Sequence, residues 1–136
     1  MAKIHLRVIT PHGVYFKGDV DYLEVRGEHS VLGILPNHTP LISALIIAPM
    51  KIKMGNNTFI YAAGEGVVNV KKEETVLLLN SIERLDEIDI ARALDAKKRA
   101  ESRLNNKDKE VTDIARAEAA LARAMNRINI YNTYKN

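Results

Sequence analysis

The chain has 136 residues, and the distribution of glycine and proline constrains its fold more than any other feature. All four prolines and all seven glycines lie in the first 66 residues, and the last 70 residues contain neither. Closely spaced turn formers are typical of short strands joined by turns, whereas their absence permits long helices. The sequence therefore predicts a β-rich first part and a helical second part.

Apolar and polar residues alternate along several short runs of the first part. In residues 4–8 three aliphatic side chains are separated by His and Arg, a period of two that turns one face of a strand inward. Gly-Asn-Asn at 55–57 separates the run 50–54 from the run 58–63, which predicts a hairpin. We also expect one strand to include Val20 through Val25. Many short strands with turns between them indicate an antiparallel sandwich or barrel.

The second part has the pattern of two helices separated by a polar break at 105–109. Asp86 and Asp89 stand where the first helix should begin, and carboxylates there can cap exposed N–H groups. Ten alanines in the last 50 residues make both helices slim. We expect an antiparallel hairpin in which the interface between the two helices buries little apolar area. The expected apolar stripes are Ile90, Ala93, Ala96, Ala100 and Leu104, then Ile114, Ala117, Leu121, Ala124, Ile128 and Tyr131.

Several kinds of chemistry are absent from the sequence. There is no cysteine, which excludes disulfides, thiol catalysis and thiolate metal sites. The four histidines lack the spacing of a helical zinc site, no serine has a recognisable nucleophile context, and no phosphate-binding loop motif occurs. We therefore expect no catalytic residue and no metal site. The N-terminus has no signal-peptide pattern, and the longest apolar stretch, 41–50, is too short to span a bilayer.

The net charge of +3 comes entirely from residues 87–136, which hold eleven Lys and Arg against eight Asp and Glu. Arginines recur there at spacings of seven and four in two rows. Solvent-exposed ion pairs, such as Asp95 with Arg99, are the ordinary interpretation of such rows. The alternative is an anion site where the rows converge, because the guanidinium fork suits phosphate. The rows are Arg92, Arg99 and Arg103, then Arg116, Arg123 and Arg127.

One segment resembles a known family. GEHSVLGILPNHTPL at 27–41 is similar to the GxxGxLGILPxHxPL signature of the epsilon subunit of rotary F-type ATP synthases, and RAEAALARAMNRINI at 116–130 resembles the second helix of Bacillus-like members. The resemblance continues in 1–16, 62–70, 85–104 and 116–130, so it runs the length of the chain. Within it, Ile88-Asp89-x-x-Arg92-Ala93 matches the family's I/L-D-x-x-R-A motif.

The resemblance implies an α+β fold and a regulatory function. A ten-stranded antiparallel β-sandwich over residues 1–84 would bind the gamma subunit and the c-ring as part of the rotor's central stalk. An antiparallel two-helix hairpin over 85–136 would switch between a compact and an extended form. The extended form would inhibit ATP hydrolysis by contacting a beta subunit of the alpha–beta ring. The subunit would be non-catalytic, monomeric when isolated, and peripheral on the cytoplasmic face of the bacterial cell membrane.

The resemblance also implies sites. No cofactor is required, but ATP would bind the compact hairpin as a regulatory ligand. His38 would contact the c-ring and gamma, and it would carry more of that contact here because Ser30-Val31 replaces the family's Gly-Glu. Arg116, Arg123 and Arg127 would contact the beta subunit. The implied ATP-binding residues are Glu83, Ile88, Asp89, Arg92, Ala93, Arg99, Arg123 and Arg127.

Two other functions remain open at the level of sequence. The chain could be a stand-alone ATP-sensing module, which ATP titration and co-purification with gamma would distinguish from a stalk subunit. A nucleic-acid-binding hairpin is a weaker alternative. A net charge of +3 spread over two mixed-charge helices is a small electrostatic footprint, and seven aromatic residues offer few stacking surfaces.

Overall fold

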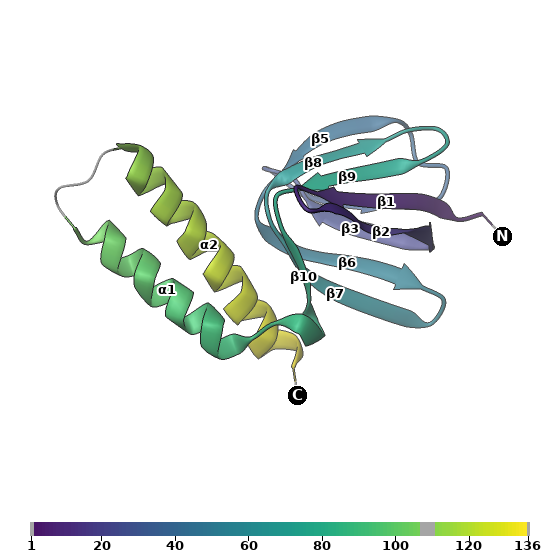
Figure 1. Ribbon diagram of the computed structural model, residues 1–136. Helices are drawn as coiled ribbons and strands as arrows, with labels where there is room; N and C mark the ends of the chain where they lie inside the picture. The colour runs from purple at the N-terminus through teal and green to yellow at the C-terminus, as the bar shows by residue number, and fades with distance from the viewer. Residues whose placement is uncertain (1, 107–110, 136) are drawn as a thin grey trace. The chain divides into compact units, whose positions relative to one another are not determined.

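A computed structural model describes residues 2–106 and 111–135 of the chain (Figure 1). Contacts divide the chain into two units, Met1–Arg84 and Leu85–Asn136. The described residues form ten strands in the first unit and, in the second, a short 3-10 helix followed by two α-helices. Positions 107–109 of the predicted polar break lie outside the described residues.

The first unit is a sandwich of two five-stranded sheets. The first sheet has the order β2-β1-β9-β8-β5, and the second has the order β10-β7-β6-β3-β4 (Figure 1). The bounds in the first sheet are β1 (Ile4–Thr10), β2 (Gly13–Val20), β5 (Leu41–Leu45), β8 (Gly66–Val70) and β9 (Thr75–Leu79). Those in the second are β3 (Tyr22–Arg26), β4 (Val31–Ile34), β6 (Ala48–Met54), β7 (Asn57–Ala63) and β10 (Ile82–Arg84).

The predicted sandwich is confirmed, and so is the hairpin around Gly55, where β6 pairs with β7 up to Met54 opposite Asn57. Among the described strands the pairings are antiparallel except that of β1 with β9, which is parallel. Inward-facing residues of both sheets form one core, as the period-two pattern requires. Its most buried side chains are Leu6, Val8, Val20, Leu23, Ile34, Met50, Ile52, Val68 and Leu77.

Gly66 shows why a glycine is needed where β8 passes β9. A Cβ added there would lie 1.8 Å from the backbone oxygen of Leu78. The backbones of the two strands could not approach so closely with any other residue.

The expected single strand from Val20 through Val25 is wrong, because the chain changes sheets at Asp21. β2 ends at Val20 in the first sheet and β3 begins at Tyr22 in the second. Asp21 fixes this crossing. Its N–H donates to the Lys53 oxygen at 2.8 Å, and its carboxylate accepts from the Gly55 N–H at 2.6 Å and from the Lys3 ammonium.

These bonds give the crossing a pH dependence. The hydrogen bond from Lys3, together with that from the Gly55 N–H, holds the pKa of Asp21 below its ordinary value of 3.8. A lowered pKa in the folded state stabilises the fold above the ordinary value, and this contribution disappears as the pH falls through the folded-state pKa. We expect Asp21→Asn to lower the urea midpoint at neutral pH and to differ little from wild type below that pKa. A midpoint difference that does not change with pH would contradict this linkage.

The second unit begins with a 3-10 helix, Leu85–Glu87, followed by α1 (Ile90–Leu104) and α2 (Val111–Tyr134). The two helices run antiparallel and pack on each other, so the predicted hairpin is confirmed (Figure 1). Ala93 and Ala100 of α1 and Ala117 and Ala124 of α2 are fully buried, each pair seven residues apart. The stripe expected on α2 is wrong in part. Ile114 is exposed, Leu121, Ile128 and Tyr131 are half-buried, and the buried large residue is Ile130.

Candidate functional site

The loop between β4 and β5 holds His38 in a tight turn. Asn37 has a φ of 64°, a left-handed conformation that asparagine tolerates better than most residues. The His38 N–H donates to the Leu35 oxygen at 3.2 Å. The His38 Nδ1 lies 2.6 Å from the Thr39 carbonyl oxygen, which can only accept, so Nδ1 carries the proton. In the neutral ring this contact selects the tautomer in which Nε2 is the acceptor.

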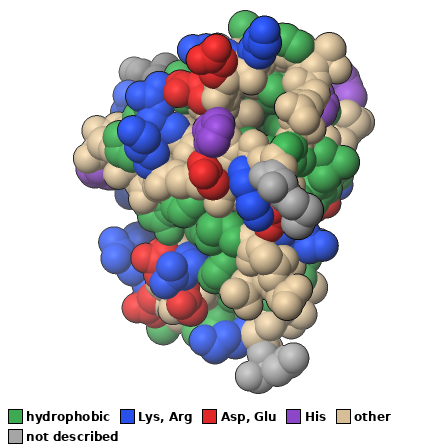
Figure 2. All heavy atoms as spheres, turned by 90° about the vertical axis from the view of Figure 1, so that its right-hand side faces the viewer, with side chains coloured by type: hydrophobic (Ala, Val, Ile, Leu, Met, Phe, Trp, Pro, Cys, Tyr) green, Lys and Arg blue, Asp and Glu red, His purple; other side chains and the backbone are tan. Residues whose placement is uncertain are grey.

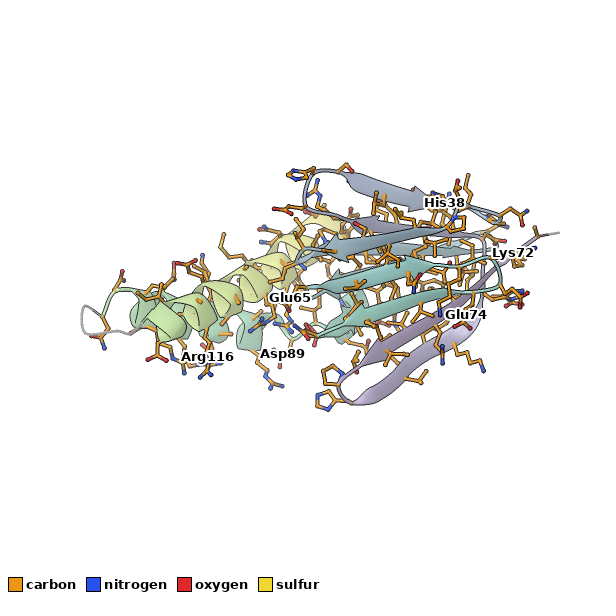
Figure 3. The ribbon with its side chains drawn as sticks, turned by 90° about the horizontal axis from the view of Figure 1, so that it is seen from above. His38, Glu65, Lys72, Glu74, Asp89 and Arg116 are labelled. Atoms are coloured by element: carbon orange, nitrogen blue, oxygen red, sulfur yellow. The ribbon has the colours of Figure 1, made fainter. Side chains whose placement is uncertain are left out.

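A hollow of about 360 Å³ lies beside this loop at one end of the sandwich. Figure 3 shows His38, Lys72 and Glu74 at this end, contributed by the β4–β5 and β8–β9 connections. Basic, acidic and histidine side chains are intermixed on the face drawn in Figure 2. A surface with both signs of charge suits a polar partner more than an apolar one. The hollow is lined by Lys3, Ile4, His5, Leu35, Asn37, His38, Val70, Lys71, Lys72, Glu73, Glu74 and Thr75.

The outer face of the first sheet carries an apolar row that the sequence pattern did not predict. Register places the row's members directly opposite one another across four strands, so their side chains share one face. Leu78 is 49% exposed, and Ile42, two residues from the row on β5, is 72% exposed. The row, in order, is Ala44 on β5, Val67 on β8, Leu78 on β9 and Ile9 on β1.

The sequence contains apolar residues at these positions, but their pattern does not show which face of the strand is exposed. Residues 75–79 are Thr-Val-Leu-Leu-Leu, a run without alternation, and Val67 and Val68 are adjacent. A run of this kind predicts a strand that is apolar on both faces. It does not say which face is exposed. In the structure Leu78 points outward, whereas Leu77 is fully buried in the core.

In the hairpin, Asp89 caps the first α-helix, as the sequence predicted. Its backbone is extended, and its Oδ1 accepts from the Arg92 N–H at 3.1 Å. This bond orders the first turn, on which the Arg92 side chain is exposed. Asp89 thus contacts Arg92 through the backbone N–H of Arg92 and not through its side chain. The Arg92 guanidinium therefore remains available to a ligand.

The arginines of the two rows differ in their surroundings. Among the described residues, the side chains of Arg92, Arg99, Arg103 and Arg116 take part in no ion pair, so the predicted Asp95–Arg99 pair is not formed. Exposed pairs of this kind contribute little, and ordering two long side chains opposes them. Arg123 and Arg127 are half-buried on α2 and do have interaction partners.

The other implied ATP-binding residues fall in both units. Glu83 is half-buried on β10, opposite Ala62 of β7, and therefore belongs to the sandwich. Ile88, in the connection from the 3-10 helix to α1, is buried, and so is Ala93 on α1. Neither of these two offers a polar side chain, so any contact that they make with a ligand is apolar or through the backbone.

Residues 2–106 and 111–135 contain no group of three or more His, Asp or Glu side chains placed to hold a metal ion. Neither α-helix, in its described part, is long and apolar enough to cross a membrane.

Comparisons with known proteins cover nearly the whole chain. Residues 3–85 match the family described as ATP synthase, Delta/Epsilon chain, beta-sandwich domain, and residues 86–132 match its long alpha-helix domain. The ATP synthase epsilon chain of Desulforamulus reducens is 43% identical over 94% of this chain and 97% of its own length. Those of Halalkalibacterium halodurans and Bacillus pumilus are 38% and 37% identical, each over 96% of this chain and 98% of their own length.

Two solved structures have a similar fold. One is a chain of the Euglena gracilis mitochondrial ATP synthase OSCP/F1/c-ring assembly, with a TM-score of 0.75 and 18% identity, covering 90% of this chain and 77% of that one. The other is a chain of the Tetrahymena thermophila mitochondrial ATP synthase central stalk and c-ring. It has a TM-score of 0.58 and 14% identity, and the match covers 96% of this chain and 99% of that one.

Proposed function

Since the chain belongs to the ATP synthase delta/epsilon family and is an epsilon chain of F-type ATP synthase, we propose that its sandwich joins gamma to the c-ring while its hairpin regulates ATP hydrolysis. In this role it turns with the central stalk and has no catalytic residue of its own. It is held at the cytoplasmic face of the cell membrane through the complex, and it is a monomer when isolated.

The apolar row on the first sheet is the observation that carries the proposal. An apolar row across four strands that is exposed at Ala44, Val67 and Leu78 and half-buried at Ile9 is costly in water and marks a surface that a partner covers. Ile42 extends this surface along β5. We propose that gamma covers the outer face of the first sheet.

The hollow beside His38 supports contact with the c-ring. This end has both signs of charge, and the His38 ring, whose Nδ1 contacts the Thr39 oxygen, offers Nε2 to a polar partner. Such a surface fits the polar loops of a partner better than an apolar segment. Because Ser30 and Val31 supply no carboxylate, we propose that His38 and the residues around the hollow make this contact.

The hairpin supports ATP binding and contact with a beta subunit. The Arg92 and Arg99 guanidinium groups are exposed on α1 and can donate in pairs to phosphate oxygens. Asp89 holds the first turn, and Glu83, Ile88, Ala93, Arg123 and Arg127 complete the proposed set. ATP acts as a regulatory ligand and no other cofactor is needed. Arg116, Arg123 and Arg127 are proposed to meet acidic residues of the beta subunit.

The alternative of a stand-alone ATP sensor makes a different prediction about gamma. A sensor would bind ATP without binding gamma, whereas a stalk subunit must bind gamma with or without ATP. The exposed apolar row favours the stalk subunit, because a module that binds only ATP has no use for it.

Leu78→Asp tests the gamma-binding surface. Leu78 is half-exposed, so the change leaves the core intact, and it places a charge where gamma would bury a leucine worth about 1 kcal/mol at half burial. We expect the dissociation constant of the complex between gamma and the full-length chain to rise about fivefold. Thr58→Asp, also exposed but on β7 of the second sheet, is the matched control and should bind gamma like wild type. Equal binding by Leu78→Asp and wild type would refute this surface.

A further inference from the structure

Two basic residues lie directly opposite each other beside the apolar row. Arg7 on β1 pairs in register with Lys17 on β2, and both point to the outer face of the first sheet. Like charges at directly opposed positions destabilise a sheet unless something compensates them. The pair therefore needs a source of negative charge.

Within the described part of the chain, only one of these two basic residues, Arg7, forms an ion pair. Arg7 Nη2 donates to Glu74 Oε1 at 2.8 Å, and its buried Nε has no partner in the described structure. The nearby Asp19 carboxylate is already bonded to His5, Oδ1 to Nδ1, at 2.6 Å. Lys17 is exposed, and in the described part of the chain its ammonium has no ion pair or hydrogen bond.

A hollow of about 260 Å³ opens at this position. It is distinct in lining from the hollow beside His38, although His5 and Glu74 border both. Its polar lining residues are His5, Arg7, Lys17, Asp19 and Glu74. Glu74 is paired with Arg7 and Asp19 with the His5 ring, so Lys17 is the charged residue of this lining whose side chain has no ion pair or hydrogen bond in the described part of the chain.

The position of the hollow links it to the apolar row. Ile9, a member of the row, is two residues beyond Arg7 on the same face of β1, a distance of about 7 Å along a strand. A partner that covers the row and extends one more position along β1 would also cover the Arg7–Lys17 pair. Removing Lys17 from water without a counter-charge would weaken such a complex, because a buried unpaired charge is strongly unfavourable.

We propose that the Arg7–Lys17 pair is a receptor site for one carboxylate of the partner on the first sheet, an acidic side chain flanking the apolar segment that covers the row. This rests on the proposed function, in which that partner is gamma. The apolar row supplies contact area, and the carboxylate fixes the register of the partner along β1 and β2 and excludes surfaces that lack it.

The test is the affinity of the full-length chain for gamma at low and high salt. Lys17→Glu should raise the dissociation constant roughly tenfold at low salt, because repulsion replaces a partly desolvated pair, and the difference should shrink at high salt. Lys17→Gln should have a smaller effect in the same direction. Lys53→Glu is the matched control, an exposed lysine on β6 of the second sheet, and should bind like wild type.

A second arm identifies the partner group. Exposed carboxylates of gamma are changed to lysine one at a time, and one of these variants should restore tight binding to Lys17→Glu. If Lys17→Glu binds as tightly as wild type at low salt while Leu78→Asp is weakened, the carboxylate site is refuted and the proposed function stands. If Leu78→Asp also binds like wild type, the surface itself is refuted, and with it both proposals.

Discussion

Replacing Arg92 with alanine is expected to weaken ATP binding to the isolated chain by about tenfold or more, since hydrogen bonds to charged groups contribute roughly 1.5–3 kcal/mol each. The structure indicates that this substitution removes the proposed ligand contact without disturbing the helix. The helix cap at Asp89 accepts from the backbone N–H of Arg92, which the substitution retains. The Arg92 guanidinium is exposed and takes part in no ion pair in the described residues, so its loss should leave the fold intact.

Calorimetric titration of the full-length chain with ATP, with and without Mg²⁺, measures the effect. Arg103→Ala is the matched control, because Arg103 is exposed in the same row of α1 and outside the proposed set. Arg92→Lys should restore binding poorly, since a point charge cannot replace the planar fork. Unchanged affinity in Arg92→Ala would mean that the motif only shapes the helix start.

Asp89 needs a different pair of variants, because it has a structural role of its own. Asp89→Asn keeps an oxygen that can accept from the Arg92 N–H, whereas Asp89→Ala removes the cap. A loss of affinity shared by both variants would indicate a contact between the carboxylate and the ligand. A loss confined to Asp89→Ala would indicate that Asp89 acts by ordering the first turn.

The sequence predicted the features that depend on local pattern. The distribution of glycine and proline separated strands from helices, and the period-two alternation in residues 4–8 identified a strand with one buried face. Asp89 was recognisable as a helix cap because carboxylates are favoured at that position. Each of these follows from residues that are neighbours in the chain.

What the sequence could not predict depends on contacts between distant residues. The change of sheet at Asp21 is held by Lys3 and Gly55, which lie 18 and 34 residues away. The parallel pairing of β1 with β9 joins strands from opposite ends of the sandwich sequence. The exposure of Leu78 depends on how the two sheets pack, because their packing decides which face of β9 enters the core. The burial of Ile130 falls outside the single stripe that helical periodicity predicts on α2.

Deleting residues 87–136 is expected to abolish the inhibition of ATP hydrolysis in the assembled complex while the sandwich still joins gamma. The sandwich has its own core and contains both sheets, so the truncated chain should fold. NMR chemical-shift dispersion of the truncated chain checks this. A truncated chain that is unfolded, or that no longer binds gamma, would contradict the independence of the sandwich.

The switch proposed for the hairpin follows from the interface between its two helices. The residues buried at equal spacing on both helices are alanines, which lack the methylenes that contribute about 0.8 kcal/mol each on burial. An alanine interface of this kind implies a small difference in free energy between the packed and the separated helices. ATP bound to arginines of both helices would favour the packed form, because a ligand shifts the population toward the state that it binds better.

Arginines of α2 would then have a different partner in each form, phosphate when the hairpin is compact and carboxylates of the beta subunit when it is extended. Replacing Arg116, Arg123 and Arg127 together with alanine should therefore raise hydrolysis at low ATP, as the truncation does. The matched control removes the same charge from α1 through Lys97, Lys98 and Arg103, and it should hydrolyse ATP at the wild-type rate. If neither the truncation nor the α2 triple variant is faster than wild type, the hairpin does not inhibit. If only the truncation is faster, inhibition is real but does not depend on these arginines.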